Sequence, residues 1–226
     1  MVSDRQLALP EPLVGCALKS GSDVFVEARR GAETQRYRAG DLAWAMHEDG
    51  VDCAIVLEPV VEAEAALDMF FVVQVAAGDA LEALGYRGVK AQWPQWVVCQ
   101  NSTYVKAQYA ISAARGSDNF PIWSVVGMRF KGYFGSSSTD LLCTFAEYFL
   151  ARVDAWETQG FQIIADAYLS RAIALLGQCE IQTIHGVRSG TAVGLDDHGN
   201  LLLKEGDEIA LVRVIDVLEP EQRDVA

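Results

Sequence analysis

Short apolar runs, separated by polar and glycine-containing segments, predict a first group of β-strands. Residues 13–18 form the earliest run, and residues 41–47 and 52–58 flank Glu-Asp-Gly, a sequence typical of a hairpin turn. Later runs of the same composition cover residues 96–100, 104–112 and 122–130. These segments predict a central sheet that is largely antiparallel.

Apolar positions that recur every three or four residues predict helices between and after these strands. The strongest repeat covers residues 60–85. A shorter helix is predicted after the first strand, with Ser20, Ser22 or Asp23 as its N-cap. Two more helices are predicted, over residues 139–158 and 161–176.

The pattern changes after Gly177, where short alternating strands are separated by turn sequences such as Asp-Asp-His-Gly-Asn. A module of about 45 residues is below the size that folds easily alone, so we expect it to pack on the preceding part. The sequence therefore predicts two units, residues 1–178 and residues 179–226. The predicted fold class is α+β, with a mixed, largely antiparallel sheet, covering helices and a small all-β C-terminal module.

Charge and composition narrow the classes of partner. The chain has 18 basic and 31 acidic residues, a formal net charge of −13. Such a surface repels phosphates, so we expect neither nucleic acid nor an anionic membrane as a partner. No apolar stretch is long enough to span a bilayer, and the first residues lack a signal-peptide core. Five scattered cysteines and three distant histidines predict reduced thiols in a cytoplasmic protein and no metal site.

Four segments carry a resemblance to a known family. They are LKSGSDVFVEA (18–28), WPQWVVCQNSTYVKAQYAIS (93–112), IWSVVGMRF (122–130) and GVRSGTAVGLDDHGNLLL (186–203). In this order they resemble the STN segment, the KWPND…KhxGIL hairpin, the hhhGIGhN strand and the C-terminal G…G…GIDxxGxLLL pattern of the biotin/lipoate protein ligases. The chain thus resembles a divergent member of that family.

The resemblance implies a fold, a reaction and partners. The fold would be that of the class II synthetases and biotin ligases, with an SH3-like C-terminal module. The reaction would join ATP, with magnesium, to biotin or a lipoyl-type acid as an acyl-adenylate. The acyl group would then pass to a lysine of a biotinyl or lipoyl carrier domain.

The same motifs imply candidate site residues. Lys106 matches the lysine that stabilises charge near the α-phosphate and the acyl carboxylate, and is the catalytic candidate. Arg36 and Arg38 are surrogate candidates for binding phosphate. The positions implied for ligand binding are Ser20, Ser22, Gly40, Trp44, Trp93, Asn101 and Tyr109.

The departures from the family pattern point to altered chemistry. The repeated Gly-Arg of the family's GRGRxGRxW nucleotide loop is absent before Trp44, where Asp41 adds a charge that repels phosphate. Gln95 and Trp96 replace the Asn-Asp of WPND, and Tyr109 replaces a small glycine and is expected to crowd the pocket. We therefore expect binding of a small carboxylic acid or acyl-adenylate, with ligase activity lost or reduced.

Two alternatives stay open at this level. The first is an acyltransferase that takes a lipoyl or octanoyl group from a donor without ATP, with Lys106 as a base or orienting group. The second is a non-catalytic interaction module whose sheet forms a homodimer or recognises a carrier domain. Lys106 also has a plain reading as a strand lysine with its ammonium group in water.

Overall fold

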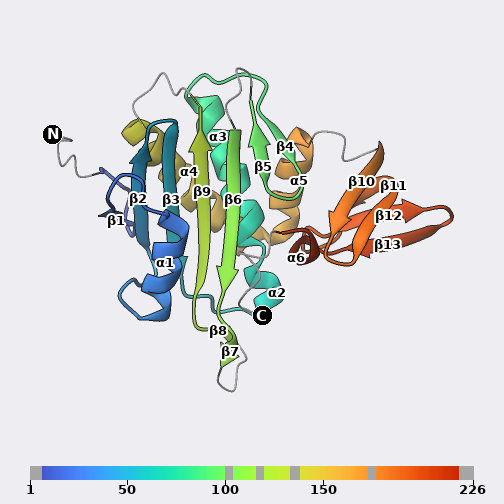
Figure 1. The fold of residues 1–226 in the computed structure, drawn as a ribbon, viewed down its shortest axis with the longest axis horizontal. Coiled ribbons are helices and arrows are strands. Elements are labelled where there is room, and N and C mark those ends of the chain that lie inside the picture. Colours follow the sequence, from blue (N-terminus) through green and yellow to red (C-terminus); the bar gives the residue numbers. More distant parts are fainter. Residues whose placement is uncertain (1–6, 100–103, 116–119, 133–137, 173–176, 219–226) are drawn as a thin grey trace.

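A seven-stranded sheet lies at the centre of the computed structural model, which describes residues 7–99, 104–115, 120–132, 138–172 and 177–218 (Figure 1). Its strand order is β1-β2-β3-β9-β6-β5-β4. Every neighbouring pair is antiparallel except β1 and β2, which are parallel. The strands are β1 (Val14–Ala17), β2 (Asp41–His47), β3 (Gly50–Leu57), β4 (Lys90–Gln92), β5 (Trp96–Val98), β6 (Tyr104–Ile111) and β9 (Ser124–Lys131).

The predicted largely antiparallel sheet is thus confirmed, and two short additions were not predicted. Strand β4 is only three residues long and carries no alternating pattern that sequence reasoning could use. Strands β7 (Ala114–Arg115) and β8 (Phe120–Pro121) pair with each other as a separate ribbon beyond the end of the large sheet.

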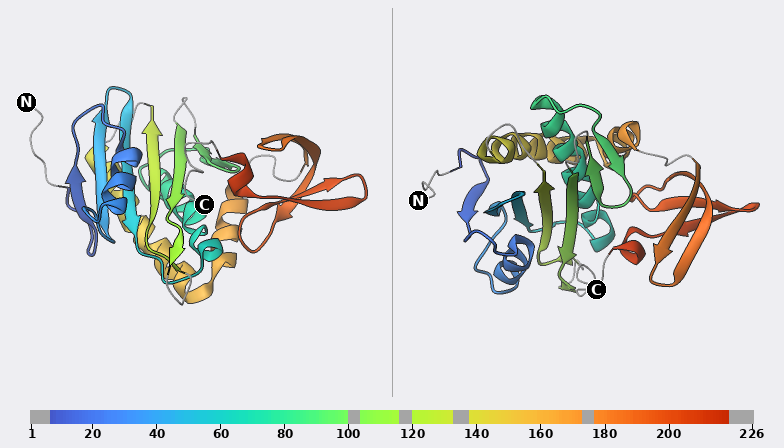
Figure 2. Two further views of the ribbon diagram at one scale, coloured as in Figure 1. Left: turned by 60° about the horizontal axis from the view of Figure 1, so that its bottom comes forward. Right: turned by 45° about the horizontal axis from the view of Figure 1, so that its top comes forward.

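Helix α1 (Val24–Glu33) covers one face of the sheet, and three longer helices cover the other (Figure 2). The side chain of Asp23 caps α1 by accepting a hydrogen bond from the N–H of Val26 at 3.1 Å, so Asp23 is the N-cap among the three predicted candidates. The opposite layer contains α3 (Met69–Ala83), α4 (Ser138–Gln159) and α5 (Phe161–Arg171).

The long helix predicted over residues 60–85 is in fact two helices, α2 (Ala63–Ala66) and α3. At the junction the N–H groups of Phe70 and Phe71 bond to carbonyls three residues back, not four. Here the side chain of Asp68 accepts a hydrogen bond from Trp156 Nε1 of α4 at 2.9 Å, a tertiary contact that no local pattern encodes. Residues 69–81 of α3 are all buried, as expected for a helix that packs on every side.

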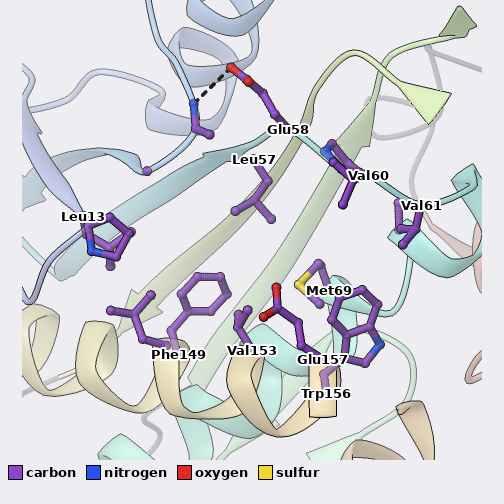
Figure 3. Close-up of a pocket in the computed structure, with 16 residues that line it drawn as sticks. Leu13, Leu57, Glu58, Val60, Val61, Met69, Phe149, Val153, Trp156 and Glu157 are labelled. Atoms are coloured by element: carbon purple, nitrogen blue, oxygen red, sulfur yellow. Dashed lines mark hydrogen bonds between the residues drawn. The ribbon is translucent and has the colours of Figure 1, made fainter. Parts of the chain in front are cut away.

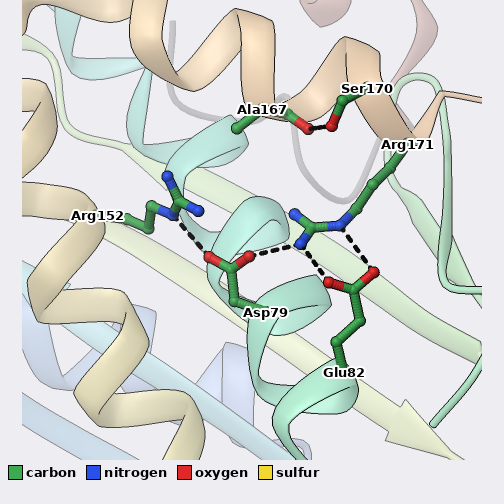
Figure 4. Close-up of polar contacts among 6 residues, drawn as sticks. All are labelled: Asp79, Glu82, Arg152, Ala167, Ser170 and Arg171. Atoms are coloured by element: carbon green, nitrogen blue, oxygen red, sulfur yellow. Dashed lines mark hydrogen bonds and ion pairs between the residues drawn. The ribbon is translucent and has the colours of Figure 1, made fainter.

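A buried ion-pair cluster joins the three helices of this layer (Figure 4). The carboxylate of Asp79 on α3 forms ion pairs with the guanidinium groups of Arg152 on α4 and Arg171 on α5, each with an N···O distance of 2.6 Å. Arg171 also pairs with Glu82 at 2.6 Å. Arg171 is the last residue of α5, because Ala172 is extended and pairs with Ala91. The predicted helix end at residue 176 is therefore wrong; residues 173–176 lie outside the described part of the chain.

The C-terminal part folds as a small antiparallel sheet, in agreement with the predicted all-β module. It packs beside the main sheet on the side of α5 (Figure 2). Trp93 Nε1 donates to the carbonyl of Gly199 at 3.0 Å, and a Cβ at Gly199 would clash with the ring of Phe71. Its elements are β10 (Gly177–Thr183), β11 (Gly186–Leu195), β12 (Leu201–Glu205), β13 (Glu208–Val212) and the short helix α6 (Val214–Val217).

The two parts share one hydrophobic core. Leu201, Leu203 and Val212 of the small sheet are buried in the same cluster as α3. Within the described residues, no helix combines the length and the apolar character needed to cross a bilayer.

Candidate functional site

Successive side chains along each strand point to opposite faces of the main sheet. On the face toward α1, which we call the α1 face, Phe25 and Ala28 pack on Ala43, Ala54 and the backbone of the central strands. Gly127 of β9 has no room for a side chain there, because a Cβ would lie 2.7 Å from Phe25 Cδ2. Helix α1 therefore covers part of this face.

Beyond the cover of α1, a row of polar and aromatic side chains crosses four neighbouring strands. Trp96 of β5 is opposite Lys106 of β6, Lys106 is opposite Arg129 of β9, and Arg129 is opposite Asp52 of β3. Because directly opposed residues of neighbouring strands share a face, these four side chains lie side by side. We call them the cross-strand row.

The next row outward adds Tyr104 of β6 and Lys131 of β9, which are opposite each other, and His47 at the end of β2. With the start of α1, these rows enclose a polar cleft of about 250 Å³. It is lined by Gly21, Ser22, Asp23, His47, Asp49, Asp52, Arg129 and Lys131.

Ion pairs within the chain occupy most of the charges of this cleft. Arg129 Nε donates to Asp52 Oδ2 at 2.8 Å, and Arg129 Nη2 is 3.9 Å from Asp23 Oδ2. His47 Nε2 lies 3.3 Å from the same Asp52 oxygen, and Lys131 Nζ is 3.2 Å from Asp49. Burial raises the pKa of the Asp52 carboxyl, and the hydrogen bond from Arg129 opposes that rise.

Aromatic rings form the other end of the cross-strand row. The Trp96 and Tyr104 rings meet edge to face with centroids 5.6 Å apart. Lys106 Nζ lies 5.6 Å from the centroid of the Trp96 ring, within the range of a cation–π contact. The α1 face thus combines an aromatic surface with two adjacent cationic side chains.

The segment before α1 holds this cleft in place. Ser20 Oγ donates to the carbonyl of Met46 at 2.8 Å and so joins the segment to the end of β2. Gly21 has a φ of +83°, which turns the chain so that Ser22 and Asp23 line the cleft. Of the predicted positions in this segment, Ser22 faces the cleft and Ser20 anchors the backbone behind it.

Two predicted pocket residues lie on the opposite face of the sheet. Tyr109 is three positions after Lys106, and an odd separation along a strand reverses the face. Its ring is 2% exposed and meets Phe70 of α3 at 6.4 Å, and its hydroxyl has no hydrogen-bond partner among the described residues. Trp44 also packs against the core that contains α3 and α4. Tyr109 and Lys106 therefore lie on opposite faces of the sheet.

The remaining predicted residues are spread over other parts of the fold. Trp93 packs on the same core and reaches the C-terminal sheet through Gly199. Gly40, with a φ of +90°, lines an apolar cavity near the start of β1. Asn101 lies outside the described residues.

The two candidate phosphate-binding arginines lie in the connection between α1 and β2. Arg36 pairs with Glu27 at 3.3 Å, and its guanidinium lies 4.8 Å from the Tyr37 ring centroid. The backbone N–H of Arg38 donates to the carboxylate of Asp41 at 2.8 Å. Neither arginine lines the polar cleft.

Sequence reasoning missed Arg129, Asp52 and His47. A signal was present for two of them, because Asp52 and Arg129 are charged residues inside strands that are otherwise apolar. Their pairing, however, depends on the register between β3 and β9.

Comparisons with known proteins agree with this fold. In solved structures, the chain is similar to a biotin protein ligase-like protein of unknown function from Silicibacter sp. TM1040, with 24% identity over 94% of this chain and 99% of that chain and a TM-score of 0.79. It is also similar to apo biotin protein ligase from Aquifex aeolicus, with 17% identity over 89% of this chain and 95% of that chain and a TM-score of 0.70. No curated protein matches.

Family profiles match both parts of the chain. The profile of the biotin protein ligase C-terminal domain matches residues 178–224, which include the small C-terminal sheet. The profile of the biotin/lipoate A/B protein ligase family matches residues 9–133, more than half of the chain, and covers both the segment before α1 and the cross-strand row. With its sheet, its C-terminal module and this match in agreement, the chain belongs to the biotin/lipoate A/B protein ligase family.

Proposed function

We propose that this protein binds a small carboxylic acid on the α1 face of its sheet, and that its ATP-dependent ligase activity is lost or strongly reduced. The observation that carries the proposal is the adjacency of Lys106 and Arg129 beside the Trp96 ring. Biotin protein ligase from Aquifex aeolicus, similar to this chain with a TM-score of 0.64, has been solved in complex with biotin and ATP. In this protein, binding of the acid or of its adenylate would be retained, whereas the ligase reaction would not.

Lys106 and Arg129 are directly opposite each other on neighbouring strands, so an anion bound between them would interact with both. A carboxylate between Lys106 Nζ and the outer guanidinium nitrogens of Arg129 would accept charge-assisted hydrogen bonds from both. The rings of Trp96 and Tyr104 would contact the apolar body of the acid. In this position Lys106 and Arg129 bind and orient the acid.

The residues of the cleft do not fit a triphosphate. Binding of phosphate oxygens needs cations and backbone N–H groups that are available to the ligand. Here Lys131 and Arg36 are each in an ion pair with a carboxylate of the same chain, and Arg129 gives its Nε to Asp52, which leaves its outer nitrogens for a single carboxylate and not for a row of phosphate groups. The N-cap carboxylate of Asp23 already accepts from the first turn of α1 and would repel phosphate.

The connection between β2 and β3 adds to this repulsion. It consists of two acidic residues, Glu48 and Asp49, of which Asp49 lines the cleft, within a chain of net charge −13. We therefore derive no adenylation step, and magnesium has no role in the proposed binding. A carrier domain as acceptor would require an activated acyl group made elsewhere.

Two measurements test the proposal. Isothermal titration calorimetry with biotin, lipoate and octanoate should detect binding of at least one acid, and Lys106→Ala should weaken it at least tenfold. Lys90→Ala, at an exposed position of β4, is the matched control and should leave the affinity unchanged. ATP–pyrophosphate exchange with the same acids should stay at background.

Each half of the proposal fails separately. Exchange above background with any of the acids would show that adenylation survives and would overturn the loss of activity. Absence of binding by all three acids, with the protein folded, would overturn the binding site. Equal affinities in wild type and Lys106→Ala would move the site away from the cross-strand row.

A further inference from the structure

We propose a second binding site, on the side of the sheet away from Lys106, for an apolar molecule that carries a protonated amine. A cavity of about 440 Å³ lies between the sheet and α4 (Figure 3). Its size falls within the roughly 300–1,000 Å³ typical of small-molecule sites. It is separate from the polar cleft, since no residue in the described part of the chain lines both.

Apolar side chains from distant parts of the chain form the walls. Phe149, Val153 and Trp156 of α4 recur at helical spacing and face the cavity from one side. Leu57, at the end of β3, and Leu13 face it from the other side. Apolar walls of this kind hold water poorly, so an apolar ligand is favoured.

Two carboxylates give the cavity a charge preference. Figure 3 shows the Glu157 carboxylate directed into the space between α4 and Met69, and Glu58 at the opposite rim. Glu58 accepts a long hydrogen bond, 3.4 Å, from the N–H of Ala39. Among the described residues that line the cavity, none is basic. A cationic head group would therefore be attracted and a carboxylate repelled, the opposite preference to that of the α1 face.

The Trp156 indole, which forms part of the cavity wall, is held in position by a polar contact outside the cavity. Its Nε1 donates to Asp68 Oδ2 at 2.9 Å, and Asp68 Oδ1 lies 3.6 Å from Nδ1 of His198, in the turn between β11 and β12. The indole is thus held by contacts to both parts of the fold, which limits its loss of freedom when a ligand binds. The site thus has an aromatic wall suited to a ring.

A set of three probes of matched shape tests the charge preference. Calorimetry should rank 4-phenylbutylamine as the tightest ligand, 4-phenylbutan-1-ol as weaker and 4-phenylbutyrate as the weakest, with at least a tenfold difference between amine and acid. The acid is titrated into Lys106→Ala, so that the α1 face does not contribute. Lys106→Ala should leave the affinity for the amine unchanged.

Variants locate the site. Glu157→Gln should weaken the amine at least fivefold and leave the alcohol unchanged, whereas Glu180→Gln, at an exposed position of β10, should affect neither. Leu57→Trp should abolish binding of both by filling the cavity; Val153→Met is a milder second variant, in case the larger one unfolds the protein.

The outcomes that overturn the proposal are distinct. Failure of both amine and alcohol to bind would show that the cavity is not a ligand site. Equal binding of the amine by wild type and Glu157→Gln, or tighter binding of the acid than of the amine, would overturn the assigned charge preference. Binding that persists in both cavity-filling variants would place the ligand elsewhere.

Discussion

Replacing Asp52 by asparagine should increase the affinity of the α1 face for a carboxylic acid. Asp52 is 5% exposed and holds Arg129 Nε at 2.8 Å. Asparagine has nearly the same shape and keeps an oxygen that can accept this hydrogen bond, so the row should stay in register. The change removes one negative charge, and because burial already disfavours the Asp52 carboxylate, we expect the fold to tolerate it.

The size of the effect follows from the geometry of the row. A carboxylate bound between Lys106 and Arg129 would lie roughly 8 Å from the Asp52 carboxylate, and two unit charges at that distance repel by about 2 kcal/mol near a protein surface. At 0.15 M salt the Debye length is about 8 Å, which reduces the repulsion to about 0.8 kcal/mol, or about fourfold in affinity. At 0.01 M salt the same estimate is about 15-fold.

Calorimetry of octanoate, biotin and lipoate with wild type and Asp52→Asn, at both salt concentrations, checks this prediction. Asp154→Asn, on the exposed side of α4, is the control for a general change in net charge and should give a ratio near one. Two results would contradict this prediction. One is an affinity of Asp52→Asn for the acids no higher than that of wild type, and the other is an increase in affinity that does not shrink as salt is added.

Three further predictions concern the core and the contact between the two parts of the chain. Asp79→Ala should lower the free energy of unfolding by about 3 kcal/mol in urea titrations, because it leaves two partly buried arginines without their shared carboxylate; an effect under 1 kcal/mol would contradict this. Burial raises the pKa of Asp68 to about 6, so the folded state keeps a proton that the unfolded chain releases near pH 4, and stability from this group falls as pH rises through that window. Relative to wild type, Asp68→Asn should therefore gain about 2 kcal/mol between pH 4.5 and 7.5 in urea titrations, and a pH-independent difference would count against it. Trp93→Phe should cost about 1 kcal/mol through loss of its hydrogen bond to Gly199, measured as a lower urea midpoint, with Asp154→Asn unchanged.

The helices and strands of this protein are largely predictable from local patterns in its sequence. The hairpin of β2 and β3, the helix α4 and the alternating strands after Gly177 follow from patterns of period two or of three to four, because each pattern reflects which neighbours a side chain meets within its own element. The segments that resemble the ligase family are also local, and they led to Lys106 and to the segment before α1.

The contacts between these elements could be seen only in the tertiary structure. At the break between α2 and α3, Asp68 is bonded to Trp156, which is 88 residues away, and the three residues of β4 form a strand by pairing with β5. The neighbours of Lys106 were set in the same way, since a shift of one residue in the register of β6 on β9 would have turned its side chain to the other face. The family motif was enough to point to Lys106 as a candidate site residue. Its neighbours Arg129, Asp52 and Trp96 could not be predicted, because strand register and side-chain face depend on contacts between residues that are far apart in the chain.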